Sequence, residues 1–122
     1  MKTYEFSQIS PEQAVTILAM VPYRESLDLG QIRWPSGYTP TPARSLQEIY
    51  YGLNVGEKII PAVDFANLIT WVDKAVGDKE LAQEIETCIS KPGNSYVKQC
   101  LELHEIVGTR LAQLREIAGD KA

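Results

Sequence analysis

Hydrophobic residues in the last third of the chain recur at alternating steps of three and four, the repeat that lines one face of an α-helix. These positions are Val97, Cys100, His104, Val107, Leu111, Leu114 and Ala118. The pattern predicts one long helix that begins at Asn94 or Ser95 and ends at Gly119. Its heptad-like seam indicates packing against other helices, either within the fold or between subunits.

The same helix carries apolar residues beyond the seam. They are Leu101, Leu103, Ile106 and Ile117. Because the apolar arc is wider than one helix-to-helix contact needs, we expect two surfaces to cover it, one of them in a homodimer.

Helix start signals are clear in the first half of the chain. Ser10 and Gln13 have the spacing of a capping box around a proline, which predicts a helix over residues 11–21. Ser45 and Glu48 repeat that spacing and predict a second, short helix. Local sequence therefore places two helix starts before the middle of the chain.

Two further helices are expected between the middle of the chain and the long last helix. Apolar spacing predicts one over residues 61–76, which begins at a proline and ends at Gly77. Asp78 then caps another, followed by a turn at residues 91–94. Its apolar positions are Leu81, Ile85, Cys88 and Ile89.

Residues 22–44 interrupt every helical period with prolines and glycines, yet they are rich in aromatic and arginine residues. A long segment of this kind is more typical of a functional loop than of disorder. We therefore predict a single, mainly α-helical domain over residues 1–122, with about five helices, a C-terminal three-helix bundle and this loop wrapped across it. The alternative is an α+β fold in which residues 2–6 and 27–34 pair as a minimal two-stranded ribbon.

Composition narrows the range of partners. The 122 residues carry a net charge of −4, and neither half of the chain is basic, which argues against nucleic-acid binding. There is no apolar run long enough to span a membrane and no hydrophobic leader at the N-terminus, so we expect a cytoplasmic protein without membrane contact.

Metal and cofactor signals are incomplete. Cys88 and Cys100 match no zinc spacing and are expected as reduced core residues. The only histidine, His104, is followed by Glu105 as in a zincin helix, but Gly108 stands where the second histidine is needed. We expect no metal, no cofactor and no catalytic residues.

Two groups of residues remain as binding candidates. Arg33, Trp34 and Tyr38 combine the residue types that dominate protein-binding hot spots. His104, Tyr50 and Trp71 are the candidate lining of a pocket between helices. The first group favours a non-enzymatic interaction or regulatory module that binds a protein partner or itself. The second gives the alternative, a domain that binds a small ligand or cofactor near His104.

Several short runs are similar to a known sequence pattern. They are Asp64-Phe65-Ala66-Asn67, Trp71-Val72, Val76-Gly77-Asp78-Lys79-Glu80-Leu81-Ala82 and Ser45-Leu46-Gln47-Glu48-Ile49-Tyr50-Tyr51. Together they resemble the D-F-A-x-W-I/V and G-D-x-x-L-A runs, with the upstream part, of an uncharacterised prokaryotic helical domain family, over about half of the chain. Residues 68–70 are additional here, and Gly52 replaces the histidine of the family. The resemblance implies a mostly helical domain of unknown activity, with no catalytic residues to carry over.

Overall fold

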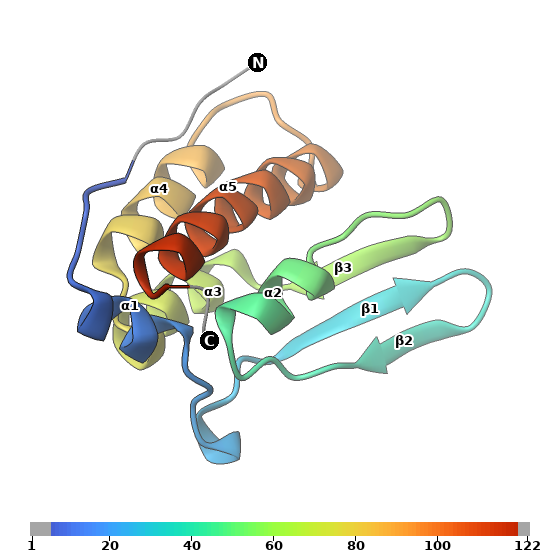
Figure 1. Cartoon of the computed structure of the whole chain (residues 1–122). Helices are drawn as coiled ribbons and strands as arrows, with labels where there is room; N and C mark the ends of the chain where they lie inside the picture. The colour runs from blue at the N-terminus through green and yellow to red at the C-terminus, as the bar shows by residue number, and fades with distance from the viewer. Residues whose placement is uncertain (1–5, 120–122) are drawn as a thin grey trace.

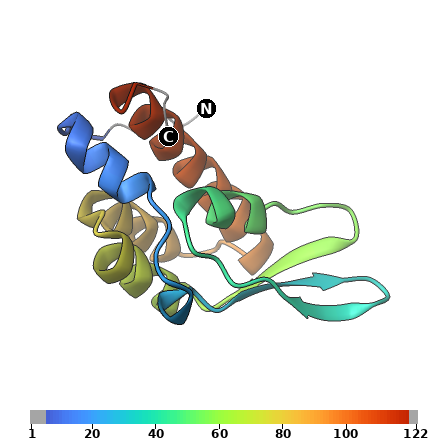
Figure 2. The ribbon, with the colours of Figure 1, turned by 60° about the horizontal axis from the view of Figure 1, so that its bottom comes forward.

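Residues 6–119 are described by the structure, a computed structural model, and they form an α+β fold of helices and one antiparallel sheet (Figure 1). The elements are α1 (Pro11–Leu18), η1 (Tyr23–Glu25), β1 (Leu29–Arg33), β2 (Gly37–Pro40), α2 (Leu46–Gly52), β3 (Ile59–Val63), α3 (Phe65–Trp71), η2 (Val72–Val76), α4 (Lys79–Ile89) and α5 (Tyr96–Ile117). The helices lie on one side of the sheet, and the hairpin end of the sheet extends away from them (Figures 1 and 2).

The prediction of a mainly α-helical fold is wrong, because three strands form an antiparallel sheet in the order β2-β1-β3. The segment expected as a wrapping loop contains two of these strands. The alternative ribbon had a strand near β1 but gave it the wrong partner, since β1 pairs with β2 and β3. Residues 2–5 of that ribbon lie outside the described residues, and Phe6 is in no strand.

The expected helix starts in the first half are present. Ser10 accepts the N–H of Gln13, whose side chain accepts the N–H of Ser10, so the capping box at α1 is complete. At α2, Ser45 accepts the N–H of Glu48, but the Glu48 carboxylate accepts the N–H of Arg44 instead of that of Ser45. The first helix ends at Leu18, three residues earlier than expected.

The third helix begins later than predicted. Pro61 lies in β3, and α3 begins after Asp64, whose side chain accepts the N–H of Asn67. The helix continues into the π-turn η2 and ends at Gly77, whose left-handed backbone (φ 84°) provides the expected stop. The expected helices of the C-terminal part, α4 and α5, follow with caps at Asp78 and Ser95.

The core is arranged around α5, which contacts α1, α2 and α4 (Figure 1). Leu103, Ile106 and Leu114 are fully buried among these helices. Leu101 is the only large apolar side chain in the middle of α5 that stays exposed. Because elements of the same chain cover the wide apolar arc, that arc gives no support to a dimer formed through this helix.

Candidate functional site

One face of the three-stranded sheet carries only apolar or aromatic side chains and glycine within the strands, and its three largest side chains, Ile32, Tyr38 and Ile60, are exposed. Successive side chains on a strand point to opposite faces, and Ile32 pairs with Tyr38 on β2 and with Ile60 on β3. These three side chains therefore form a row across the sheet. The six residues of this outward face are Gly30, Ile32, Tyr38, Pro40, Ile60 and Ala62.

The two faces of the sheet differ in burial. On the inner face Leu29 is 1% exposed and lies against Gly52 of α2, where an added Cβ would come within 2.5 Å of its side chain. On the outward face Ile32 is 48% exposed, Tyr38 57% and Ile60 37%. The sheet thus leaves an apolar row open to solvent, and such patches mark interaction sites.

The ring of Tyr38 lies over Gly30 of the neighbouring strand. A Cβ at residue 30 would be 2.4 Å from Tyr38 Cε1, so only glycine leaves room for the ring. The glycine is buried beneath a tyrosine that is itself exposed. This contact places the aromatic ring over Gly30 and reduces the freedom that it would lose on binding.

The free edges of the sheet are poorly suited to pairing with a further strand. The amide of Thr41 donates to the Leu29 carbonyl of β1. Because hydrogen bonding alternates along an antiparallel ladder, Tyr38 and Pro40 are the β2 residues whose main-chain groups point away from β1, towards the free edge. Pro40 has no N–H to offer there. On β3, the Tyr96 hydroxyl donates to the Pro61 carbonyl (2.6 Å) and accepts the N–H of Val63 (3.1 Å). Burial raises the pKa of Tyr96 to about 12, which keeps this hydroxyl protonated at neutral pH. Contact by strand addition is therefore disfavoured, and the face is left for binding.

The structure places the three predicted partner-binding residues on one hairpin. Arg33 ends β1, Trp34 lies in the turn, and Tyr38 is on β2. Trp34 is 76% exposed, the highest value among the exposed large apolar side chains of residues 6–119. Arg33 donates to the side chain of Gln31 at 3.0 Å. The sequence pattern thus found the hairpin but missed Ile60, which joins it only through the pairing of β3 with β1.

Two of the three predicted pocket residues also meet. The ring of Tyr50 on α2 stacks on the imidazole of His104 on α5, with centroids 4.2 Å apart and planes 15° apart. A Cβ at Gly108 would lie 2.6 Å from Tyr50 Cε1, so this mid-helix glycine makes room for the ring. Burial lowers the pKa of His104, which favours the neutral imidazole at pH 7.

A shallow depression of about 560 Å³ opens beside this stack. It is lined by Tyr50, Leu101, His104, Glu105, Gly108 and Thr109. Trp71, the third predicted pocket residue, does not reach it: its side chain is buried, and its indole N–H donates to the Glu25 carbonyl at 2.6 Å. Trp71 borders a separate hollow of about 370 Å³ next to residues 26–28.

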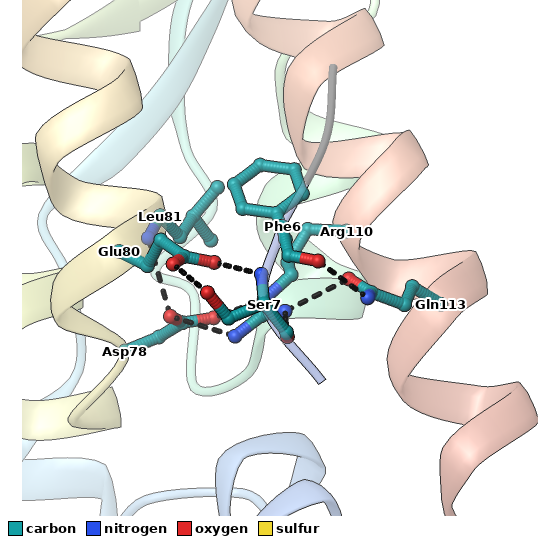
Figure 3. Close-up of polar contacts among 7 residues, drawn as sticks. All are labelled: Phe6, Ser7, Asp78, Glu80, Leu81, Arg110 and Gln113. Carbon is teal, nitrogen blue, oxygen red and sulfur yellow. Dashed lines mark hydrogen bonds and ion pairs between the residues drawn. The ribbon is translucent and has the colours of Figure 1, made fainter. Parts of the chain in front are cut away.

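The most connected polar cluster was not expected from the sequence. Arg110 of α5 and Asp78 before α4 are each 2% exposed and form a two-point ion pair, with N–O distances of 2.7 and 3.2 Å (Figure 3). Asp78 was identified as a helix cap, and it also accepts the N–H of Leu81. Arginine in a helical pattern gives no sign of burial, because long charged side chains usually reach solvent.

Glu80 extends this cluster to the surface, where it accepts two hydrogen bonds from Ser7. Burial alone would raise the pKa of Glu80, but the hydroxyl and amide donors of Ser7, with the charge of Arg110, outweigh it and lower the pKa. The carboxylate therefore stays ionised and keeps both bonds across the neutral range.

The described part of the chain contains no disulfide and no group of residues arranged as a metal site. Cys88 and Cys100 are both buried and form no disulfide, and the Cys88 thiol donates to the Glu102 carboxylate at 3.3 Å. Residues 6–119 contain no cluster of three or more His, Cys, Asp or Glu placed to hold a metal ion. None of the described helices is long and apolar enough to cross a membrane.

Comparisons with family models, with curated proteins and with solved structures gave no match to this chain. The resemblance to a prokaryotic helical family therefore stays a prediction.

Proposed function

We propose that this chain is a non-enzymatic protein-interaction module that self-associates through the outward face of its sheet. One observation carries the proposal: Ile32, Tyr38 and Ile60 form an exposed apolar row on a face to which β1, β2 and β3 contribute no charged residue. The exposed Trp34 at the hairpin turn extends the same region. Hot spots of protein interfaces are built from such residues.

A second copy of the chain fits this face better than an added strand. The blocked edges of β2 and β3 disfavour edge-to-edge pairing, whereas two sheets stack face to face about 10 Å apart. A two-fold axis parallel to β1 and between the two copies sets Ile32 against Ile32 and Tyr38 against Ile60 of the other copy. The large ring then faces a smaller side chain, and the contact is isologous, as closed dimers require.

The size of the surface sets the expected strength. From their exposed fractions, the four large side chains leave on the order of 450 Å² of surface open on each copy. Two copies then bury about 900 Å², which lies below the ~1,200–2,000 Å² of stable complexes and within the range of transient ones. We therefore expect a weak dimer that forms at high micromolar concentration.

Sedimentation equilibrium from about 10 µM to 1 mM tests this function with two matched variants. Ile32→Lys places two like charges at the centre of the contact and is expected to weaken the dimer more than tenfold. Val15→Lys is the control, because Val15 on α1 has a similar exposure, 52%, far from the sheet. A wild-type chain that stays monomeric at 1 mM, or equal effects of the two variants, contradicts the proposal.

A second function is supported by the depression beside the Tyr50–His104 stack, which suits a small planar ligand. The neutral imidazole offers one donor and one acceptor, and the Tyr50 ring offers an apolar surface. Titration with small aromatic heterocycles, followed by NMR, is expected to shift the amides of Gly108 and Thr109. Shifts confined to the sheet, or no shifts at millimolar ligand, would exclude this function.

Cys88 and Cys100 are buried without a disulfide, which supports a cytoplasmic location within this proposal, because reducing compartments keep cysteines in the thiol form. Fractionation of cells that express the protein, with thiol labelling after denaturation, tests the location. Recovery in an oxidising compartment with blocked thiols contradicts it.

A further inference from the structure

Residues 6–9, called here the strap, cross the N-terminal end of α4 and the side of α5 (Figure 3). The helices α1 to α5 are called here the body. Each polar main-chain contact of the strap is made by a side chain of the body. Ser7 donates its N–H (2.5 Å) and its hydroxyl (2.8 Å) to the two oxygens of Glu80. The Gln113 amide donates to the Phe6 carbonyl at 3.1 Å.

Arg110 completes the contact with the strap. Its guanidinium lies 4.9 Å from the centre of the Phe6 ring, a cation–π distance, and donates to the Ser7 carbonyl at 3.4 Å. Three side chains of the body thus recognise an aromatic residue followed by a serine in extended conformation. The arrangement is that of a peptide-binding site whose peptide belongs to the same chain.

The strap is weakly tied to the rest of the fold. Within residues 6–119 no backbone-to-backbone hydrogen bond joins residues 6–9 to another element. Phe6 and Ile9 are half-buried and pack against the edge of the core, and Ser7 and Gln8 are exposed. A segment without backbone hydrogen bonds to the rest of the fold and with no fully buried side chain opens at lower cost than the core.

The body beneath the strap stays satisfied when the strap leaves. Arg110 keeps its two bonds to Asp78 and a 2.8 Å bond to Gln113, and Asp78 keeps the N–H of Leu81. No buried charge loses its partner, so the main penalty that would oppose release is missing. Glu80 and the outer side of Gln113 then face solvent, ready to accept another segment.

We infer that the surface formed by Glu80, Arg110 and Gln113 beneath the strap is a docking site for an extended peptide with an aromatic residue followed by serine or threonine. In the free protein the strap fills this site, and a segment of the same chemistry from a partner displaces it. The strap is therefore a built-in competitor that sets a threshold for partner binding. This inference is independent of self-association through the sheet, because the docking site and the sheet share no residue.

Binding of a fluorescent peptide of residues 3–9, measured by anisotropy on the full chain, tests the inference. The double variant Phe6→Ala/Ser7→Ala weakens the strap and is expected to bind the peptide at least tenfold more tightly than the wild type. Gln8→Ala is the matched control in the same segment and is expected to bind like the wild type. Adding Glu80→Gln to the double variant is expected to remove at least tenfold of the gain, since one amide oxygen replaces two carboxylate acceptors.

Three results with these variants overturn the inference. They are equal peptide affinity of the wild type and the double variant, a gain that survives Glu80→Gln, and loss of helical circular dichroism in the double variant. Hydrogen exchange on the wild type gives a readout that needs no variant. The Ser7 amide is expected to exchange at least tenfold faster than the Leu81 amide, and equal rates would show that the strap opens only when the whole chain unfolds.

Discussion

Apolar surface is buried in the helical body but is left exposed on one face of the projecting sheet. In the body, α1, α2 and α4 surround α5, and even the arginine at its centre is buried with a full set of partners. In the sheet, α2 covers the base of the inner face at Leu29, whereas the outward face leaves its central isoleucine half exposed. Since both regions belong to one chain, the difference separates residues that maintain the fold from residues that are free to bind.

The largest expected effect concerns the buried ion pair of the body. Arg110→Met leaves Asp78 buried without its partner and is expected to cost about 3–5 kcal/mol of unfolding free energy. Urea denaturation measures the loss. The double variant Asp78→Asn/Arg110→Met is expected to recover part of it, because asparagine still caps α4 and no charge remains. A loss below about 1 kcal/mol would show that the helical body tolerates a buried, unpaired Asp78 carboxylate. The contrast between a tightly specified body and an open sheet would then be weaker.

A smaller effect is expected where α2 meets α5. Gly108→Ala gains about 1 kcal/mol of helix propensity but forces the Tyr50 ring away from α5, for a net loss of about 1–2 kcal/mol. Thermal unfolding measures it. With Tyr50→Ala as background, the same replacement is expected to stabilise the protein. Stabilisation by Gly108→Ala alone would mean that the Tyr50–His104 stack adds little to the body.

The stack also predicts a pH dependence. Burial lowers the pKa of His104, so the folded chain binds a proton there less readily than the unfolded chain. The neutral His104 therefore contributes to the unfolding free energy above pH 6.5, the ordinary pKa of histidine. This contribution is lost as the pH falls from 6.5 through the lower pKa of the folded chain. Unfolding free energies between pH 7.5 and 5 measure this slope, and His104→Gln is expected to flatten it, since the chain has no other histidine. An unchanged slope in the variant would assign it to another group.

The smallest effect on stability is expected at the hairpin turn. Trp34→Ala removes a side chain that is 76% exposed, so the unfolding free energy is expected to change by no more than about 0.5 kcal/mol. Self-association, by contrast, is expected to weaken. Paired melting and sedimentation experiments on this variant decide between a binding surface and a lid over the core, which would cost roughly 3–5 kcal/mol. A large fall in the melting temperature would show that Trp34 maintains the fold, as residues of the helical body do, and is not free to bind.

The amino-acid sequence by itself determined the start of most helices and the end of the third. Ser10, Ser45, Asp78 and Ser95 cap helices through bonds to residues three positions away, and Gly77 ends one through its own backbone conformation. These contacts are local, so neighbouring residues specify them. The same reasoning brought Arg33, Trp34 and Tyr38 together, because a hairpin joins residues close in sequence.

Only the tertiary structure decided the sheet and the buried charges. Pairing between β1 and β3 joins residues about 30 positions apart, and the short strands alternate too briefly to reveal it. Pro61, which local rules place at a helix start, fits an edge strand because its missing N–H faces outward, where the Tyr96 hydroxyl bonds its carbonyl. Arg110 and Asp78 are 32 positions apart, and their burial depends on packing that no local pattern encodes.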